Sequence, residues 1–349
     1  MCAEFGGIRT YVEHLLRVWP DLYPDDDVHV LLRRGSDVPT DPRVVRHERS
    51  IRPRLGPFGR PWAQTLELPR LVRHVRPDVV LATLPSTTVR RVGVPTAVVV
   101  YDLRHEMRPE QFSRSNRLFR AISYGRGYAL ADGFLSISQR SLDDLHHRHP
   151  RLVRTPGRVT HLGADHVDEW IADSRDHAVT FAHHTNKNLD LVLDAWRHLL
   201  ARDASPPPLR VLGLNAARRE ELMPRLAAAG LEGWVELAPF LPEDEFQRTF
   251  ASARVIVFPS DFEGFGLPVA EGMRLGIPVV IGPERATLEV AGGHAVVMTD
   301  WSSSALASAV ERAMALDTQQ LADARRFVAR YTWAETAAQT RAMLARISN

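Results

Sequence analysis

Short, nearly continuous apolar runs alternate along this chain with segments of helical periodicity, in two successive series. Such runs are typical of parallel strands, because crossover helices bury both faces of a parallel sheet. In the first series, strands are expected at 28–32, 78–82, 96–100, 133–137 and 158–162, and helices at 9–19, 64–75, 115–130 and 139–147. In the second, strands are expected at 179–182, 209–213, 234–237, 255–258 and 278–281, and helices at 188–200, 217–229, 242–251 and 267–275. The sequence therefore predicts two doubly wound α/β sheets, one from each series.

The two series indicate two Rossmann-like domains. A chain of 349 residues is too long for one ordinary hydrophobic core and suits two. The polar stretch 163–177 separates the series and is the expected linker. Helices expected at 303–316 and 318–348 close the chain.

Composition excludes several classes of protein. The net charge of +2 gives no sign of a nucleic-acid-binding arm. Cys2 is the one cysteine, so an internal disulfide or a cysteine zinc site is excluded and a reducing cytoplasm is expected. The longest apolar stretches are far shorter than a membrane span, and the 15 histidines show no metal-binding spacing.

The start of the chain departs from the doubly wound pattern. Gly6 and Gly7 resemble the glycine turn that follows the first, central strand, but they come too early for that strand to precede them. We expect either that the natural polypeptide begins upstream with a short apolar strand, or that this domain is built unusually.

Residues 259–272 are the most informative segment. A strand ends there, a glycine-bearing loop follows, and a helix opens near Leu267. Such a loop presents backbone N–H groups at the carboxyl end of a strand, where ligands bind in this architecture. Glu263 lies in the loop and Glu271 lies eight residues later, on the helix. Their carboxylates suit the vicinal hydroxyls of a sugar and of a ribose.

Lys187 is the single lysine among 44 basic residues of the lysine and arginine types. Arginine is tolerated at every other basic position, so a lysine here points to a requirement for a compact ammonium group. A compact ammonium group and helix N-termini can both stabilise a negatively charged group without a metal ion.

The segment around Glu263 and Glu271 resembles the signature of family 4 of the GT-B glycosyltransferases, in which seven residues separate two glutamates. Further resemblances lie at 6–12, 76–80, 95–102, 137–141, 186–196 and 333–337. The resemblance implies an acceptor-binding domain at 1–165, a nucleotide-sugar-binding domain at 166–330 and a helix at 331–349 that crosses back to the first domain. It implies a donor site in the cleft between the domains, and retaining, metal-independent sugar transfer with no cofactor.

The resemblance also implies roles for individual residues. Glu263 and Lys187 would be catalytic, with Glu263 orienting the donor sugar and Lys187 contacting the diphosphate. The donor would further contact Gly6, Gly7, His183, Gly264, Phe265, Gly266, Leu267 and Glu271, of which Glu271 would hold the ribose. The base would lie near 237–241. Tyr101, Asp102 and His105 would lie on the acceptor side.

Three departures from the family pattern leave alternatives open. The arginine that usually precedes the family's lysine is absent, and either His183 replaces it or nothing does. Tyr101 stands where a histidine is usual, and Pro239 stands where a glycine is usual in the base-binding segment. A non-catalytic nucleotide- or glycan-binding relative, or an epimerase of the same fold, is the alternative reading.

The acceptor is expected to be a glycan, a lipid-linked sugar or a small molecule. Arg114, Arg117, Arg120 and Arg126 share one expected helix with apolar residues, so that helix either contacts an anionic membrane peripherally or is an ordinary solvated helix. Residues 25–27 formally match a metal-binding Asp-x-Asp, but they are expected to form a solvated turn. No nucleic-acid partner and no metal are expected.

Overall fold

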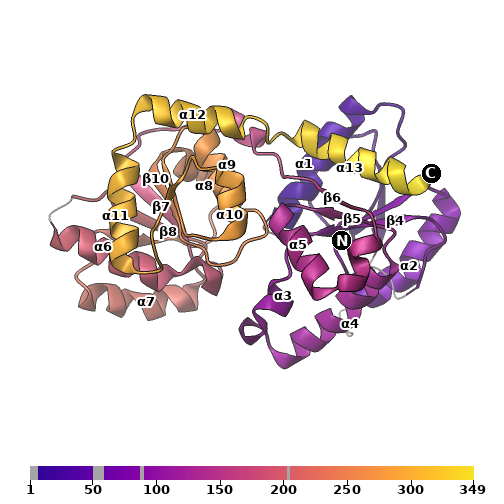
Figure 1. Ribbon diagram of the computed structural model, residues 1–349, viewed down its shortest axis with the longest axis horizontal. Coiled ribbons are helices and arrows are strands. Elements are labelled where there is room, and N and C mark those ends of the chain that lie inside the picture. Colours follow the sequence, from indigo (N-terminus) through magenta and orange to yellow (C-terminus); the bar gives the residue numbers. More distant parts are fainter. Residues whose placement is uncertain (1–6, 50–58, 87–89, 203–204) are drawn as a thin grey trace. The chain divides into compact units, whose positions relative to one another are not determined.

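The computed structural model describes residues 7–49, 59–86, 90–202 and 205–349. The chain forms two compact units (Figure 1). Unit 1 comprises Met1–Gly163 together with Thr332–Asn349, and unit 2 comprises Ala164–Tyr331. Each unit is a mixed α/β body with parallel strands, as the alternating pattern predicts.

The described strands of unit 1 form two parallel sheets. One pairs β1 (His29–Arg33) with β2 (Val45–Arg49), and the other has the order β3 (Val80–Ala82), β4 (Thr96–Val100), β5 (Gly133–Ser136) and β6 (Gly157–Val159). The helices are α1 (Gly7–Leu22), α2 (Gly59–Val75), α3 (Arg104–Met107), α4 (Arg114–Leu130), α5 (Gln139–Arg148) and α13 (Trp333–Ser348), with 3-10 turns η2 (Pro109–Gln111) and η3 (Pro150–Arg154). The strand expected upstream of Gly6 falls outside the described residues and stays a prediction.

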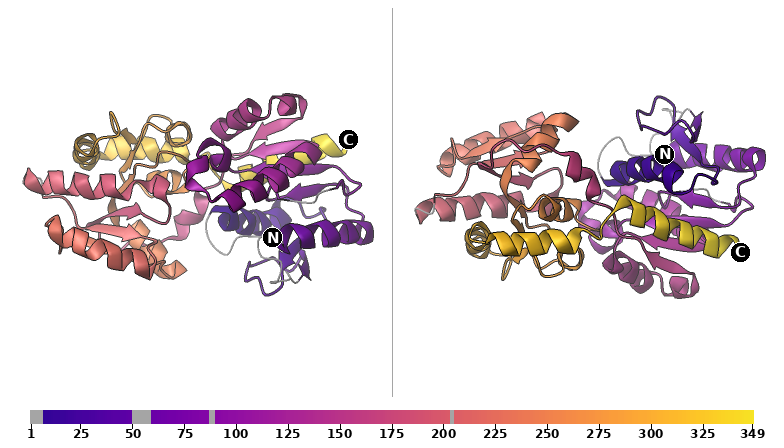
Figure 2. Two further views of the ribbon diagram at one scale, coloured as in Figure 1. Left: turned by 90° about the horizontal axis from the view of Figure 1, so that it is seen from below. Right: turned by 90° about the horizontal axis from the view of Figure 1, so that it is seen from above.

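Helix α13 returns to unit 1 and packs against α1, β4 and β5 (Figures 1 and 2). The Trp333 ring stacks on His14 with centroids 4.8 Å apart, and the Arg341 guanidinium donates to the Asp26 carboxylate at 2.8 Å. Where the chain passes between the units, the Ala164 N–H donates to the Tyr331 carbonyl at 2.9 Å. A Cβ on Gly163 would lie 2.3 Å from the Trp333 backbone nitrogen, so this passage requires glycine.

Unit 2 contains one six-stranded parallel sheet. Its order is β12 (Val296–Val297), β11 (Val279–Ile281), β10 (Ala253–Phe258), β7 (His177–Phe181), β8 (Leu209–Leu212) and β9 (Val235–Leu237). The helices are α6 (Leu189–Ala201), α7 (Ala216–Ala228), α8 (Glu243–Ala251), α9 (Leu267–Arg274), α10 (Arg285–Ala291), α11 (Ser303–Met314) and α12 (Thr318–Val328), with 3-10 turns η4 (Asp165–Glu169) and η5 (Thr185–Lys187). Successive strands run outward from β7 to β9, and the chain then returns to β10 on the other side of β7.

The core of unit 2 follows from the apolar runs of the sequence. Every residue of β7 is buried, and β10 is buried except at Arg254. Helices α6 and α11 pack against each other, and the fully buried Trp196 of α6 donates its indole N–H to the Pro207 carbonyl at 3.1 Å. A rigid sheet therefore supports the loops at its carboxyl edge.

Several elements differ from the expectation. Strand β2 was not anticipated because its sequence, VRHER, is highly charged. One continuous helix was expected at 318–348, but the structure has two helices, α12 and α13. Thr332 caps the start of α13, because its hydroxyl accepts a hydrogen bond from the Glu335 N–H at 3.1 Å. Helix α10 and strand β12 were also missed, because both are short.

Candidate functional site

The sheet order of unit 2 brings two sequence-predicted residues to one place. Lys187 ends η5, directly after β7, and Glu263 lies in the loop after β10. Strands β7 and β10 are hydrogen-bonded neighbours, and the order of strands reverses between them. Ligands of doubly wound sheets bind at such a reversal, beside the carboxyl ends of the strands. The candidate site of unit 2 is therefore the switch point between β7 and β10.

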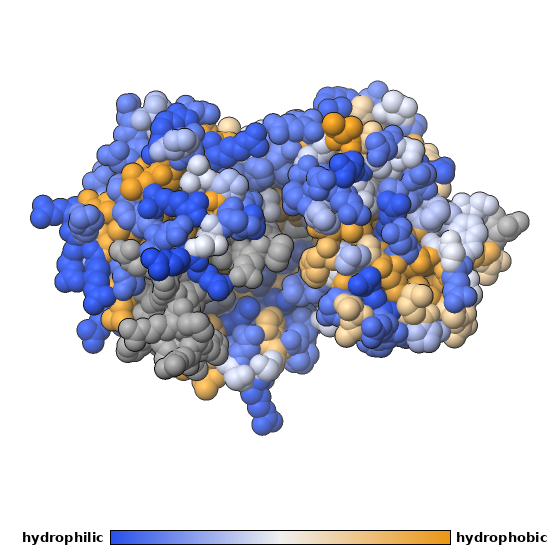
Figure 3. Space-filling model, turned by 180° about the vertical axis from the view of Figure 1, so that it is seen from behind, coloured by the Kyte–Doolittle hydropathy of each residue, from blue (hydrophilic) through white to orange (hydrophobic). Residues whose placement is uncertain are grey.

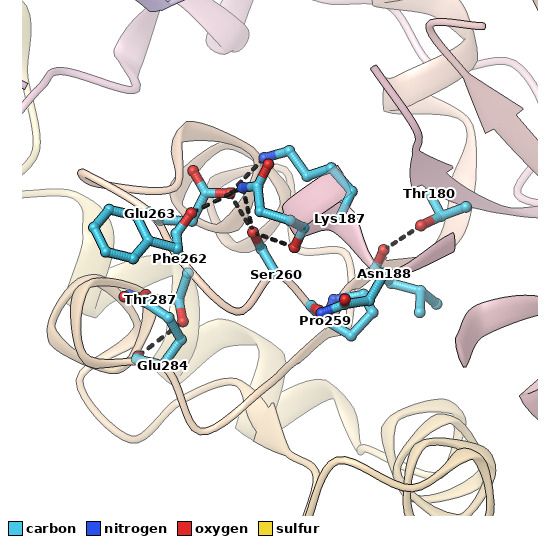
Figure 4. A network of polar contacts seen from close by, with 11 residues as sticks. Thr180, Lys187, Asn188, Pro259, Ser260, Phe262, Glu263, Glu284 and Thr287 are labelled. Carbon is cyan, nitrogen blue, oxygen red and sulfur yellow. Dashed lines mark hydrogen bonds and ion pairs between the residues drawn. The ribbon is translucent and has the colours of Figure 1, made fainter. Parts of the chain in front are cut away.

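Lys187 and Glu263 form an ion pair at this point (Figure 4). The Lys187 Nζ lies 2.5 Å from Glu263 Oε1 and 4.2 Å from the centroid of the Phe258 ring. The lysine is only 7% exposed. Water screens such a charge poorly, so the ammonium acts strongly on any anion placed beside it.

Asn186 and Ser260 complete the environment of Glu263, and the sequence did not single them out. The Ser260 hydroxyl lies 2.5 Å from Glu263 Oε1, and the Asn186 Nδ2 lies 3.1 Å from the same oxygen. Asn186 Nδ2 also lies 2.8 Å from the Phe262 carbonyl, and both polar side chains are buried. One carboxylate oxygen is thus surrounded by three donor groups from two loops, which orients the Glu263 side chain.

The loop after β10 leads into helix α9 through a conformation that favours glycine. Gly266 has φ of +95° and is the N-cap of α9, and a Cβ there would lie 3.0 Å from Thr287 Cγ2. Leu267 is the first residue of α9, and Phe265 is buried with its ring centroid 5.7 Å from that of Tyr331. Gly264 lies half-buried between Glu263 and Phe265. The loop therefore delivers the N-terminus of α9 beside Glu263, and a helix N-terminus favours anions.

Glu271 lies on α9 and is 6% exposed. Its Oε1 lies 3.1 Å from Nε2 of His166, which belongs to η4. This histidine was not anticipated either, because nothing in the local sequence connects the linker with α9. Glu263 lies in the loop and Glu271 lies on the helix that follows it, and different partners therefore hold the two carboxylates.

His183 is exposed and contacts other rings beside the end of β7. Its centroid lies 4.9 Å from that of His184 and 6.5 Å from that of Phe240. The carbonyl of Pro239 accepts from the Gly213 N–H at 3.3 Å. Part of the backbone hydrogen-bonding capacity of the expected base-binding segment is therefore already used within unit 2, and the segment itself includes an exposed aromatic ring, that of Phe240.

The remaining candidates belong to unit 1. Gly7 is the first residue of α1, whereas Gly6 lies outside the described residues. Tyr101 follows β4, and its ring centroid lies 5.9 Å from that of Tyr11 on α1. The Asp102 carboxylate accepts from the Arg104 N–H at 2.8 Å and so turns the chain into α3. His105 is buried, with its ring centroid 5.0 Å from that of Tyr124.

Glu106, next to His105, has a strongly perturbed pKa. Burial raises its pKa, but the neighbouring imidazoles of His105 and His149 outweigh burial, so the pKa of Glu106 lies well below its usual value. The His149 Nε2 lies 3.0 Å from Glu106 Oε1 and the His105 Nε2 lies 3.5 Å from it. The carboxylate therefore stays ionised and holds α3 to the segment after α5.

The described residues contain no group of three or more metal-ligating side chains of the His, Cys, Asp or Glu types. Asp26, the middle residue of the Asp-x-Asp match, instead accepts from the Trp19 indole at 3.1 Å and from Arg341. No helix within the described ranges has the length and apolarity needed to cross a membrane. On the face shown in Figure 3, hydrophilic residues cover most of the surface, with smaller hydrophobic groups among them.

Two family models match the chain. Residues 5–167 match the model described as Glycosyltransferase Family 4, and residues 176–315 match the one described as Glycosyl transferases group 1. The O-antigen chain mannosyltransferase B of Escherichia coli is 27% identical over 157 residues, which are 44% of this chain and 41% of that protein. The MMP alpha-(1->4)-mannosyltransferase of Mycolicibacterium hassiacum is 32% identical over 122 residues, or 33% and 30% of the two chains. The matches thus span less than half of these relatives.

Solved structures resemble the whole chain. The structure of Anabaena Alr3699/HepE in complex with UDP-glucose has a TM-score of 0.73 and 17% sequence identity, over 99% of this chain and 98% of that one. WaaG, a glycosyltransferase involved in lipopolysaccharide biosynthesis, has a TM-score of 0.67 and 12% identity, over 99% and 96%. At these identities the likeness shows the two-domain GT-B fold. Together with the two family matches, it shows that the chain belongs to family 4 of the GT-B glycosyltransferases.

Proposed function

We propose that the protein transfers a hexose from a nucleoside-diphosphate sugar to an acceptor hydroxyl, with retained anomeric configuration and without a metal ion. The observation that carries the proposal is the meeting of Lys187 with Glu263 at the switch point of unit 2. A buried ammonium and a fixed carboxylate at that edge suit a ligand that carries both phosphate and hydroxyl groups.

Each residue of the site has a role in this proposal. Lys187 stabilises the charge that develops on the diphosphate as the bond to the sugar breaks. Glu263 orients the donor sugar by accepting hydrogen bonds from its hydroxyls. Backbone N–H groups of Gly264, Phe265, Gly266 and Leu267 support the sugar hydroxyls or the phosphate, and Glu271 accepts hydrogen bonds from the ribose. Gly6 and Gly7 are further proposed contacts of the donor, and Gly7 is the first residue of α1.

The proposed reaction is a front-face displacement. The bond between the anomeric carbon and the phosphate oxygen breaks, and a bond from the acceptor oxygen forms on the same face of the sugar. The proton of the acceptor hydroxyl passes to the departing phosphate oxygen, so the nucleoside diphosphate leaves as the second product. Tyr101, Asp102 and His105 are proposed to face the acceptor. His183 is the proposed substitute for the absent arginine, as a weaker and pH-dependent phosphate partner.

The named relatives guide the choice of donor. Two of them are named mannosyltransferases, and one solved structure of similar fold is a complex with UDP-glucose. We propose a hexosyl donor activated by UDP or GDP. Ring stacking on the exposed Phe240 suits either base, since every base presents a π-face, whereas Pro239 cannot donate a backbone N–H to a base edge.

The acceptor is proposed to be a glycan, with a lipid-linked sugar as the favoured form. Helix α4 exposes Leu118 and Ile122, at 62% and 59%, on the same face, and it exposes Arg114 and Arg117 nearby. Exposed apolar residues beside arginines suit a peripheral contact with an anionic lipid surface. Co-sedimentation with anionic and neutral vesicles tests this contact: binding to the anionic vesicles that is lost in the Leu118→Ser/Ile122→Ser double variant supports it, and binding to neither refutes it.

A nucleotide-sugar panel tests the transferase proposal. UDP- and GDP-linked hexoses are incubated with the protein, with and without candidate acceptors, and release of the nucleoside diphosphate is measured. Transfer with the anomeric configuration of the donor, read by NMR of the product, supports the proposal. Binding without release would identify a non-catalytic relative, and conversion of the donor into its sugar epimer would identify an epimerase.

A further inference from the structure

The segment that leads into unit 2 is bonded twice to the helix that carries Glu271. Asp168 of η4 forms a bidentate ion pair with Arg274 of α9, with N–O distances of 2.7 and 2.6 Å. Two residues earlier on η4 and three residues earlier on α9, His166 Nε2 lies 3.1 Å from Glu271 Oε1. The two pairs join the same two elements, but only one of them reaches the carboxylate that the proposed function places at the ribose.

The two pairs differ in burial. Asp168 is 46% exposed, so its pair with Arg274 lies at the rim of the unit. The side chains of His166 and Glu271 are each only 8% exposed. A buried carboxylate needs hydrogen-bond donors, because removing it from water without them is costly. His166 is such a donor for Glu271 within unit 2.

The imidazole of His166 is itself held in place. Its centroid lies 5.6 Å from that of Trp170, with the rings nearly perpendicular at 78°. Trp170 packs in turn on Phe246 and Phe250 of α8, at 5.8 and 5.6 Å between centroids. The position of the histidine is therefore fixed by packing that does not depend on Glu271.

We propose that His166 is a positioning residue for donor binding, which fixes the Glu271 carboxylate in the orientation that accepts the two ribose hydroxyls. This inference rests on the proposed function. A carboxylate offers about four acceptor directions over its two oxygens, so one bond from His166 to Oε1 leaves capacity for a vicinal diol. Attachment of η4 to α9 does not require His166, since the bidentate Asp168–Arg274 pair already provides it.

The proposal predicts a particular split of kinetic effects. Without His166, Glu271 has more rotamers to lose on binding, so nucleotide affinity should fall by about five- to tenfold. The rate constant kcat at saturating donor should change little, because the breaking bond lies at Glu263 and Lys187. Loss should therefore appear in the KM for the donor.

Calorimetric titration with UDP and GDP tests the proposal on five forms of the full chain: the unaltered protein, His166→Ala, His166→Gln, Asp168→Ala and Glu271→Ala. Glutamine donates from an amide nitrogen, so His166→Gln should restore most of the affinity lost in His166→Ala. Asp168→Ala removes the other bond between η4 and α9 and should lower the melting temperature without weakening nucleotide binding.

The outcomes distinguish failure of the ribose role proposed for Glu271 from failure of the positioning role proposed for His166. If Glu271→Ala binds the nucleotide as well as the unaltered protein does, or if neither nucleotide binds, the ribose role fails and this inference fails with it. If Glu271→Ala weakens binding but His166→Ala does not, only the inference is overturned. Equal losses of affinity in His166→Ala and Asp168→Ala, with no rescue by glutamine, would show that His166 merely attaches η4 to α9.

Discussion

Replacing Lys187 with alanine should reveal whether this lysine acts on the diphosphate or only balances Glu263. In the structure, Lys187 Nζ lies 2.5 Å from Glu263 Oε1. UDP or GDP alone is the suitable probe, because neither carries the sugar on which Glu263 is proposed to act. A lost hydrogen bond to a charged group costs about 1.5–3 kcal/mol, so Lys187→Ala should weaken nucleotide binding roughly 10- to 150-fold.

The fold should survive this change. Breaking a buried ion pair costs about 3–5 kcal/mol when the remaining charge is left without partners. Here Glu263 keeps the donors from Ser260 and Asn186, so we expect a cost near 3 kcal/mol. That is less than the stability of a typical domain, about 5–15 kcal/mol, and corresponds to a fall in Tm of roughly 6–12 °C.

Glu263→Gln is the matched control. It removes the carboxylate but keeps its size, so it should abolish most of the transfer while leaving nucleotide affinity unchanged or improved. Affinities of both variants and of the double variant, measured by calorimetry well below their melting temperatures, complete a double-mutant cycle. If Lys187→Ala has no effect on nucleotide affinity in either background, the diphosphate role is refuted and the lysine is only a counterion.

Three further predictions concern metal, folding and pH. Transfer should persist in EDTA, and its loss with recovery on adding manganese would contradict a role for Lys187 in place of a metal. Gly163→Ala should destabilise the protein by about 1–3 kcal/mol because its Cβ would meet the Trp333 backbone, whereas Gly125→Ala on α4, where a Cβ meets nothing within 4 Å, should stabilise it; similar melting temperatures for the two variants would contradict this. Burial raises the pKa of Tyr11 to about 12, so its contribution to stability is complete below pH ~10 and is lost as the pH rises to about 12. Chemical denaturation of Tyr11→Phe should show a shallower alkaline fall than the unaltered protein, and an identical fall would refute the assignment.

The sequence predicted the two-domain fold well because its buried parallel strands are nearly continuous apolar runs, separated by segments of helical periodicity. It also singled out Lys187 and Glu263, by rarity and by the glycine-bearing loop. It did not predict that they pair, because 76 positions separate them and only the order of β7 and β10 brings them together. The single lysine is therefore shared between a carboxylate and the proposed phosphate.

Other features escaped prediction for identifiable reasons. Asn186 and Ser260 carry no local signal of their role. Asn186 lies in a different loop from its partner Glu263, and Ser260 lies three residues before Glu263 in the same loop. His166 faces α9 from the linker, a contact that no periodicity encodes. The break between α12 and α13 did carry a signal, because Thr332 and Glu335 have the spacing of a helix N-terminus.

The return of α13 to unit 1 determines the order in which the two units can finish folding during translation. Residues 332–349 emerge only after all of unit 2, so unit 1 cannot be completed until then. At about 5–20 residues per second, translation of unit 2 occupies roughly 10–30 s. Throughout that time the side of α1 and of the sheet that α13 covers lacks its covering helix, including the surface around Tyr11. Unit 2, whose chain is continuous, can finish folding first, and the nascent first half is then the part that a chaperone must protect.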